Sequence, residues 1–139
     1  MASKAQMTGM RGVYLVASEL TRCGLIATPT SRSAAGADIL VTNKDCSNTF
    51  SVQVKTNART FNFWLVGKKI PVSPSHVYVL VNIRPNKGDE LIEYFIVPSK
   101  VIAEKTKVPA ASSKGFDSFR LDVAEPFRDK WDIFSKKNN

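Results

Sequence analysis

The chain is poor in the residues that build disulfide frameworks or zinc sites. Among its 139 residues are two cysteines, Cys23 and Cys46, and one histidine, His76. Two cysteines do not make a disulfide framework, and without a Cys-X-X-Cys pair or a second histidine a structural zinc site is not supported. We therefore expect a reduced, cytoplasmic protein in which His76 is a structural or surface residue.

Long hydrophobic runs are also missing. The longest strongly apolar run covers residues 77–83 and contains Asn82, so it is far shorter than the ~20 residues needed to span a bilayer. The first twelve residues lack the long apolar core of a secretory signal. We expect no membrane segment.

Acidic residues are outnumbered by basic ones. Twelve acids stand against 20 lysines and arginines, giving a net charge of +8 and a pI near 9.7. Such a balance favours a polyanionic partner, although a solvated basic surface without a partner gives the same composition. The positive residues are not confined to a tail, which predicts a folded basic face: Arg11, Arg22, Arg32, Lys55, Arg59, Lys68, Lys69, Arg84 and Lys87.

Length and hydrophobic content predict one α/β domain over residues 1–139, with termini free to be flexible. A 43% hydrophobic chain of this size can bury a core of its own. Apolar residues at helical spacing predict a helix over residues 8–23, ended by Gly24. Apolar runs separated by turn residues then predict the strands of one mixed sheet, at residues 25–28, 37–42, 50–56, 61–66, 77–83 and 93–97.

The last third of the chain is predicted to be more irregular. Ser99 is a possible N-cap of a short helix that Pro109 closes. Residues 110–115 are predicted to form a loop, residues 117–123 an edge strand, and residues 127–134 a final helix or turn.

The most informative segment covers residues 36–57, GADILVTNKDCSNTFSVQVKTN. Side chains alternate across a strand, so Gln53 and Lys55 project to one face while Val52 and Val54 pack on the other. A polar turn lets the strand that carries Asp38 fold back beside them. Carboxylate, amide and ammonium groups are thus expected to converge, although a half-exposed structural strand shows the same alternation.

In these residues the chain resembles the PD-(D/E)XK nuclease superfamily, which includes restriction endonucleases and Holliday-junction resolvases. The likeness covers roughly the first half of the chain and implies a restriction-endonuclease-like mixed β-sheet flanked by helices. Glu19, Asp38 and the triplet Gln53-Val54-Lys55 stand where that family carries its helical glutamate, its aspartate and its acidic-X-lysine triplet. The chain departs from the pattern because Gln53 replaces the usual acid and Val13 sits near the common place of the glutamate.

The resemblance implies Mg²⁺-dependent hydrolysis of DNA, with Mn²⁺ as a possible substitute metal. The implied metal ligands are Asp38, Gln53, the Val54 carbonyl and Glu19, and Lys55 would act on the attacking water and the phosphate. A homodimer is expected, since two strands of a duplex must be cut. Two alternatives stay open: a nuclease fold that binds nucleic acid or a protein without cutting, and an interaction module with no nucleic-acid role.

Further residues are candidates for DNA contacts. The segment of residues 28–33 carries hydroxyls and a guanidinium that could hold a phosphate, but it could equally be an ordinary polar loop. The predicted contacts are Arg11, Arg32, Ser33, Asn57 and Arg59. Phe61, Phe63 and Trp64 are assigned to packing or to a dimer surface.

Overall fold

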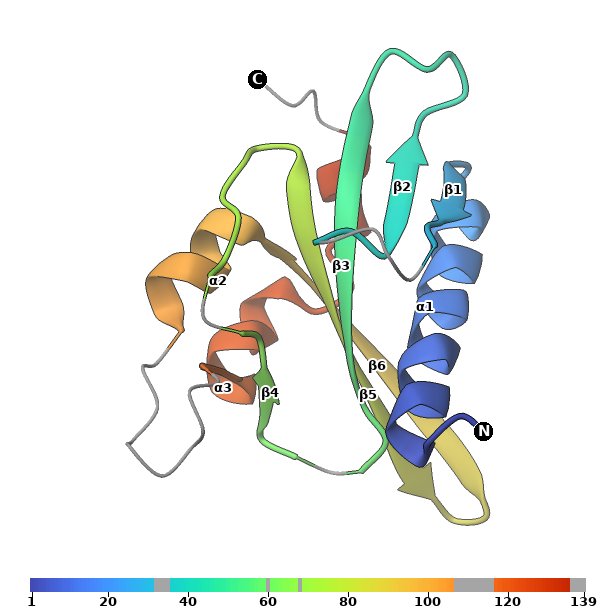
Figure 1. Ribbon diagram of the computed structural model, residues 1–139, viewed down its shortest axis with the longest axis vertical. Helices are drawn as coiled ribbons and strands as arrows, with labels where there is room; N and C mark the ends of the chain where they lie inside the picture. Colours follow the sequence, from blue (N-terminus) through green and yellow to red (C-terminus); the bar gives the residue numbers. More distant parts are fainter. Residues whose placement is uncertain (32–35, 60, 68, 107–116, 136–139) are drawn as a thin grey trace.

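The computed structural model describes residues 1–31, 36–59, 61–67, 69–106 and 117–135. Its main element is a five-stranded sheet in the order β1-β2-β3-β5-β6 (Figure 1). All neighbouring strands are antiparallel except β3 and β5, which run parallel. The strands are β1 (Ile26–Pro29), β2 (Ile39–Thr42), β3 (Thr49–Asn57), β5 (His76–Asn86) and β6 (Asp89–Pro98). The expected mixed sheet is confirmed.

Helix α1 (Lys4–Arg22) begins four residues before the predicted start. Ser3 and Gln6 form a capping box, in which the Ser3 hydroxyl accepts from the Gln6 N–H and the Gln6 side chain accepts from the Ser3 N–H. Two otherwise unpaired backbone donors are thereby satisfied, which extends the helix past the apolar pattern. The helix ends at Arg22, and Gly24 follows with a φ of 84°, as expected for a glycine after a helix.

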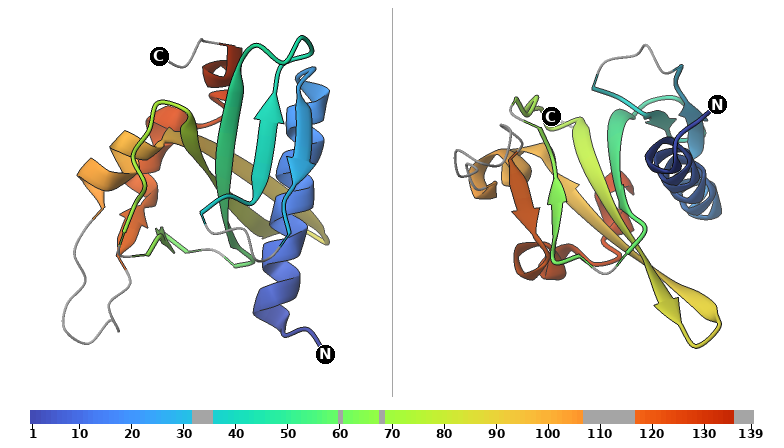
Figure 2. Two further views of the ribbon diagram at one scale, coloured as in Figure 1. Left: turned by 45° about the horizontal axis from the view of Figure 1, so that its top comes forward. Right: turned by 60° about the horizontal axis from the view of Figure 1, so that its bottom comes forward.

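Two hydrophobic cores lie on opposite faces of the sheet. Val79 and Val81 of β5 point to the core under α1, whereas Tyr78 and Leu80 point to the second core. The second core is covered by α2 (Ser99–Lys105), by α3 (Leu121–Ala124) and by a two-stranded sheet of β4 (Phe63–Leu65) and β7 (Ser118–Arg120). Figure 2 shows α1 separated from α2 and α3 by the main sheet. Both faces of the central strands are therefore buried.

Three details of the sequence predictions were wrong. The run 61–66 supplies β4, which pairs with β7 in the small sheet and not with the main sheet. Only Ser118–Arg120 of the expected edge strand is a strand, and residues 121–124 are helical. Ser99 is the first residue of α2, not its cap, because its hydroxyl bonds the backbone of Ser73. The expected final helix or turn corresponds to the 3₁₀ helices η2 (Glu125–Phe127) and η3 (Trp131–Ser135).

The remaining expectations concern Pro109 and the loop after it, the two cysteines and a membrane segment. Pro109 and the loop 110–115 lie outside the described residues. Cys23 and Cys46 are both free and exposed. None of the described helices is long and apolar enough to cross a membrane.

Helix α1 approaches β3 most closely at Gly12. A Cβ atom on Gly12 would lie 1.8 Å from Thr56 Oγ1 and 2.8 Å from Thr56 Cβ, whereas nothing lies within 4 Å of a Cβ on Gly9. Rotation of the Thr56 side chain would move its hydroxyl but not its Cβ atom. The helix can therefore reach this position only with glycine at residue 12.

We expect Gly12→Ala to lower the free energy of unfolding by about 1–3 kcal/mol, since α1 must shift away from β3. Gly9→Ala is the matched control, and it should raise stability by about 0.5–1 kcal/mol through helix propensity alone. Urea unfolding measures both effects. Equal stability of the two variants would show that the close approach does not position the helix.

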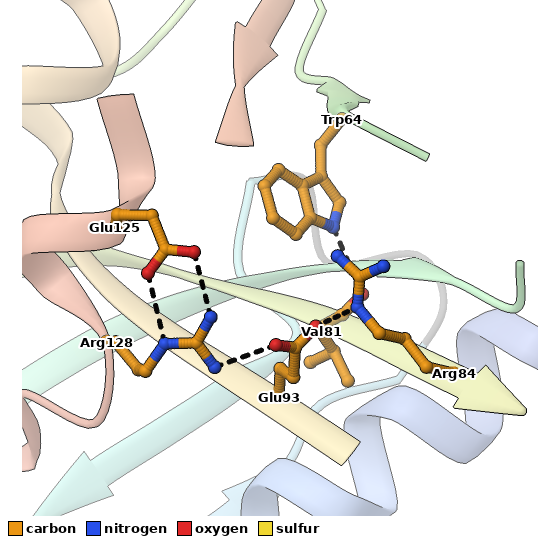
Figure 3. Close-up of polar contacts among 6 residues, drawn as sticks. All are labelled: Trp64, Val81, Arg84, Glu93, Glu125 and Arg128. Atoms are coloured by element: carbon orange, nitrogen blue, oxygen red, sulfur yellow. Dashed lines mark hydrogen bonds and ion pairs between the residues drawn. The ribbon is translucent and has the colours of Figure 1, made fainter. Parts of the chain in front are cut away.

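An ion-pair network joins the C-terminal segment to the sheet (Figure 3). The Glu93 carboxylate of β6 accepts hydrogen bonds from Arg84 Nε and, at 2.8 Å, from Arg128 Nη1. Arg128 also makes two bonds to Glu125 and lies 4.8 Å from the centre of the Phe95 ring. Trp64 ties β4 to the same face through a 3.0 Å bond from its Nε1 to the Val81 carbonyl. These contacts fix the elements that cover the second core.

Acid should unfold the protein partly through Glu93. Burial opposes its ionisation, but the hydrogen bonds from Arg84 and Arg128 outweigh burial and lower its pKa. The stabilisation is therefore complete above the unfolded pKa of about 4.3 and is lost as the pH falls through the lower folded pKa. Glu93→Gln should cost about 2 kcal/mol at neutral pH and flatten the stability curve in acid.

The control for this variant is Glu104→Gln, because Glu104 is exposed and its only ion pair among the described residues is with Lys100, at 4.0 Å. It should change stability by less than about 0.5 kcal/mol. An unchanged acid dependence of unfolding in Glu93→Gln would contradict the assignment.

Candidate active site

Asp38 is held where β2 and β3 diverge. Its backbone N–H donates to the Val52 carbonyl at 2.8 Å, and its Oδ2 accepts from the Val54 N–H at 2.8 Å and from Gln53 Nε2 at 3.0 Å. Strand β2 begins only at Ile39, opposite Val52, so Val54 has no partner on β2. The Asp38 carboxylate therefore accepts the hydrogen bond that a longer β2 would have accepted from Val54. The same bond holds the carboxylate in place.

Thr30, the residue after β1, also holds the backbone at Asp38. The Thr30 N–H donates to the Asp38 carbonyl at 2.9 Å, and the Thr30 hydroxyl donates to the Ala37 carbonyl at 2.6 Å. Asp38 is half-buried, and its Oδ1 makes no hydrogen bond with the described residues. One carboxylate oxygen is thus used for structure, and the other is left for a ligand.

Gln53 and Lys55 lie on the same face of β3, as alternation predicts. Both are half-buried, while Val52 and Val54 belong to the core under α1. A cavity of about 360 Å³ contains both side chains together with Gly36, Val66, Lys69, Pro71 and Tyr78. None of the ion pairs among the described residues includes Lys55 or Lys69. The structure therefore joins Asp38 to Gln53 through a hydrogen bond, and Gln53 shares one cavity with Lys55 and Lys69.

Tyr78 is a member of this site that the sequence analysis missed. It is the register partner of Gln53 on the parallel strand β5, and its hydroxyl has no hydrogen-bond partner among the described residues. Burial raises the pKa of Tyr78, and the negative charge of Asp38 raises it further. The phenol therefore stays protonated at neutral pH and can donate a hydrogen bond into the cavity.

No pattern in the sequence indicated that Tyr78 and Lys69 belong to the site. Tyr78 lies in an apolar run that is typical of a core strand, and only the pairing of β3 with β5 places it beside Gln53. Lys69 belongs to the connection between β4 and β5, which no periodicity describes. His76, interpreted as structural, is buried and its Nδ1 lies 2.7 Å from the Ser51 hydroxyl. Burial lowers its pKa.

Glu19 is not brought to this group. Its carboxylate pairs with Arg22 Nε at 2.7 Å, and it does not line either cavity beside Asp38. Val13 and Gln6 line the larger of these cavities instead. Glu19 follows Val13 by six residues, which is about 9 Å along the helix axis. The α1 face nearest Asp38 therefore supplies an amide and an apolar side chain, and no carboxylate.

The predicted DNA contacts fall into three groups. Arg11 makes a two-bond ion pair with Glu90, at 2.9 and 2.5 Å, which ties α1 to the β5–β6 hairpin. Asn57 Nδ2 donates to the Phe63 carbonyl at 2.8 Å and so holds the start of β4, whereas Arg59 is exposed. Arg32 and Ser33 lie outside the described residues. Trp64 is buried, but Phe61 and Phe63 are exposed.

A divalent cation fits the chemistry of the Asp38 group only as a weakly held ion. Within the described residues no three His, Cys, Asp or Glu side chains gather for a metal. The oxygen donors present are Asp38 Oδ1, the Gln53 amide oxygen and the Val54 carbonyl, which faces the same side of β3 as the Val54 N–H. Mg²⁺ is commonly held by one or two carboxylates together with waters and phosphate oxygens. The donor set therefore suits Mg²⁺ that also takes ligands from a substrate.

Comparison with known proteins gives a fold and no close relative. No family model and no curated sequence matches the chain. Hjc, a Holliday junction resolvase from the archaeal hyperthermophile Archaeoglobus fulgidus, is similar over 94% of this chain and 98% of its own, with 11% identity and a TM-score of 0.57. A bacterial homing endonuclease is similar over 97% and 94%, with 13% identity and a TM-score of 0.59.

These identities are low, so the two likenesses concern the fold. They agree with the expected mixed α/β domain, whose sheet is flanked by helices. Each covers nearly the whole chain, including the second half, for which the sequence carried no family motif. The chain has a nuclease-like α/β fold.

Proposed function

We propose that this protein is a metal-dependent endonuclease that hydrolyses phosphodiester bonds in DNA, with a Gln-X-Lys form of the PD-(D/E)XK site. One observation carries the proposal: the Asp38 carboxylate is fixed by Val54 and Gln53, and Gln53 shares a cavity with Lys55. The similarity of the fold to that of a Holliday junction resolvase and of a homing endonuclease supports it.

The residues of the chain divide the chemistry between them. Asp38, the Gln53 amide oxygen and the Val54 carbonyl would hold Mg²⁺, or Mn²⁺ in its place. The chemistry that such an ion supplies when bound is a lowered pKa for a coordinated water and polarisation of the phosphate. Lys55 orients the attacking water and offsets the charge that develops on the phosphoryl oxygens. The protonated Tyr78 hydroxyl and Lys69 bind the phosphate from the same cavity.

DNA as the partner follows from charge. The chain carries +8, and Lys55 and Lys69 face the proposed site without ion pairs among the described residues. Cations in this position bind phosphate groups and release counterions from DNA. The homodimer belongs to the same proposal, since a single site in each chain reaches both strands of a duplex only as a pair.

A second function has a specific observation in its favour. The site contains one carboxylate, because Gln53 replaces an acid and α1 presents Gln6 and Val13 to the cavity. A site with less negative charge holds a metal more weakly. The competing function is a nuclease-fold module that binds nucleic acid or a protein without cutting it.

Asp38→Ala should abolish Mg²⁺-dependent cleavage of DNA while binding stays equal or becomes slightly tighter. The variant removes a metal ligand and also a negative charge that repels the phosphates. Gel assays on linear, supercoiled and branched DNA measure cleavage, and fluorescence anisotropy at several salt concentrations measures binding.

Asp45→Ala is the matched control, because Asp45 lies in the exposed β2–β3 turn and bonds only Ser47. It should cleave as the wild type does. If Asp38→Ala cleaves as fast as wild type, the proposed site is wrong. If the wild-type protein cuts no DNA or RNA with Mg²⁺ or Mn²⁺, the binding module is the better function.

Gln53→Glu tests the unusual triplet. It restores an acid next to Asp38, so the Mg²⁺ concentration for half-maximal cleavage should fall by about 10-fold, which corresponds to roughly 1.4 kcal/mol of added metal affinity. Ser51→Glu, two residues earlier on the same face of β3, is a control for added charge alone. A Mg²⁺ requirement that is unchanged in Gln53→Glu would contradict a ligand role for residue 53.

A further inference from the structure

The larger cavity beside Asp38 has an apolar wall, unlike the smaller cavity, which contains two lysines. Its volume is about 520 Å³, and it is lined by residues of α1, of the end of β1 and of the middle of β3. Asp38, Gln53 and Val54 form one side, and Met10, Val13 and Tyr14 of α1 form the other. Gln53 thus separates this apolar cavity from the smaller cavity that contains Lys55 and Lys69.

The apolar wall is not covered by the rest of the described chain. Tyr14 is 60% exposed and Met10 is 38% exposed, whereas Val16 and Leu20 of the same helix are fully buried. The exposed side chains continue to Met7, and Lys4 stands at the edge of the same surface. The Tyr14 hydroxyl has no hydrogen-bond partner among the described residues. A tyrosine and a methionine left open beside a catalytic carboxylate mark a binding surface.

We propose that this cavity receives one unstacked nucleobase of a DNA strand, which stacks on Tyr14 and Met10 while its neighbouring phosphate lies at Asp38 and Lys55. The inference rests on the proposed nuclease function and adds the substrate class: DNA with unpaired nucleotides at the site, such as single strands or branch points. A base inside a duplex cannot reach the wall of α1 without leaving its stack.

The chemistry of the cavity selects this occupant. A nucleobase has two apolar faces and a polar edge, and the cavity has an aromatic and thioether wall with Gln6 and Thr30 at its border. Phosphates on either side of the base would meet Lys4 and Lys55, in keeping with the positive charge of the chain. A second copy of the protein on the same surface would close the mouth of the cavity that contains Asp38. An unpaired base, in contrast, would leave Asp38 accessible to the phosphate next to that base.

The test measures binding without cleavage. The probe is a single-stranded oligodeoxynucleotide with one 2-aminopurine, used alone and annealed to its complement, in EDTA. Wild-type protein should quench the 2-aminopurine fluorescence of the single strand. Tyr14→Ala should lose the quenching and bind the single strand about 5- to 100-fold more weakly, with less than about 2-fold change for the duplex. Tyr14→Phe should keep both properties.

Phe61→Ala is the matched control, because Phe61 is an exposed aromatic residue that lines neither cavity. It should bind as wild type does, and an equal loss in both alanine variants would overturn the proposal. Sedimentation of the same proteins tests whether a second copy of the protein occupies this surface instead. If the wild type is a dimer and Tyr14→Ala is a monomer, the surface is a dimer interface and the proposed base site is wrong.

The same measurements also distinguish a failure of this inference from a failure of the proposed nuclease function. Quenching that depends on Tyr14 in a protein that never cleaves supports the base site and removes the nuclease. Cleavage that depends on Asp38 with quenching indifferent to Tyr14 removes the base site alone.

Discussion

The contact between the Asp38 carboxylate and the Val54 N–H joins two requirements of the molecule. Strand β3 continues past the start of β2, so the Val54 N–H needs an acceptor that the ladder does not provide. An unpaired backbone donor costs about 1–3 kcal/mol when buried. Because the carboxylate removes this cost, the sheet can open at that point, and Gln53 and Lys55 become accessible from the side. Structure and proposed chemistry thus depend on the two oxygens of one carboxylate, Oδ2 for the sheet and Oδ1 for the proposed metal.

Helix α1 determines the shape of the opening. It packs against β3 at Gly12 and Thr56 with almost no space between them, and its C-terminal half is buried through Val16 and Leu20. Figure 1 shows α1 running along β3. Met10 and Val13 of the helix line the same cavity as Asp38 and Gln53. A close contact in the middle of the helix therefore fixes the neighbouring side chains that form the cavity wall, Met10, Val13 and Tyr14. The site depends on helix position as well as on its own hydrogen bonds.

Local patterns in the sequence were enough to predict part of this arrangement. The alternation of residues 50–56 gave the faces of β3 correctly, and the polar turn before it placed Asp38 beside Gln53. Non-local pairing was not predictable in the same way. Tyr78 reaches the site through the parallel contact of β3 with β5, and β4 pairs with β7 more than fifty residues later. Glu19 had the right residue type, but only its position on the helix shows that it faces Arg22.

The segment from residue 117 to residue 135 contributes to both cores. Phe119 and Ala124 fill the core beneath the small sheet, and Phe134 packs at 5.2 Å against the Phe50 ring on the opposite face of the main sheet. Neither face is complete until this segment has joined it. During synthesis on a ribosome, the apolar faces of α1 and of the strands therefore stay exposed until residue 135 has left the exit tunnel, so both cores of this domain are completed late.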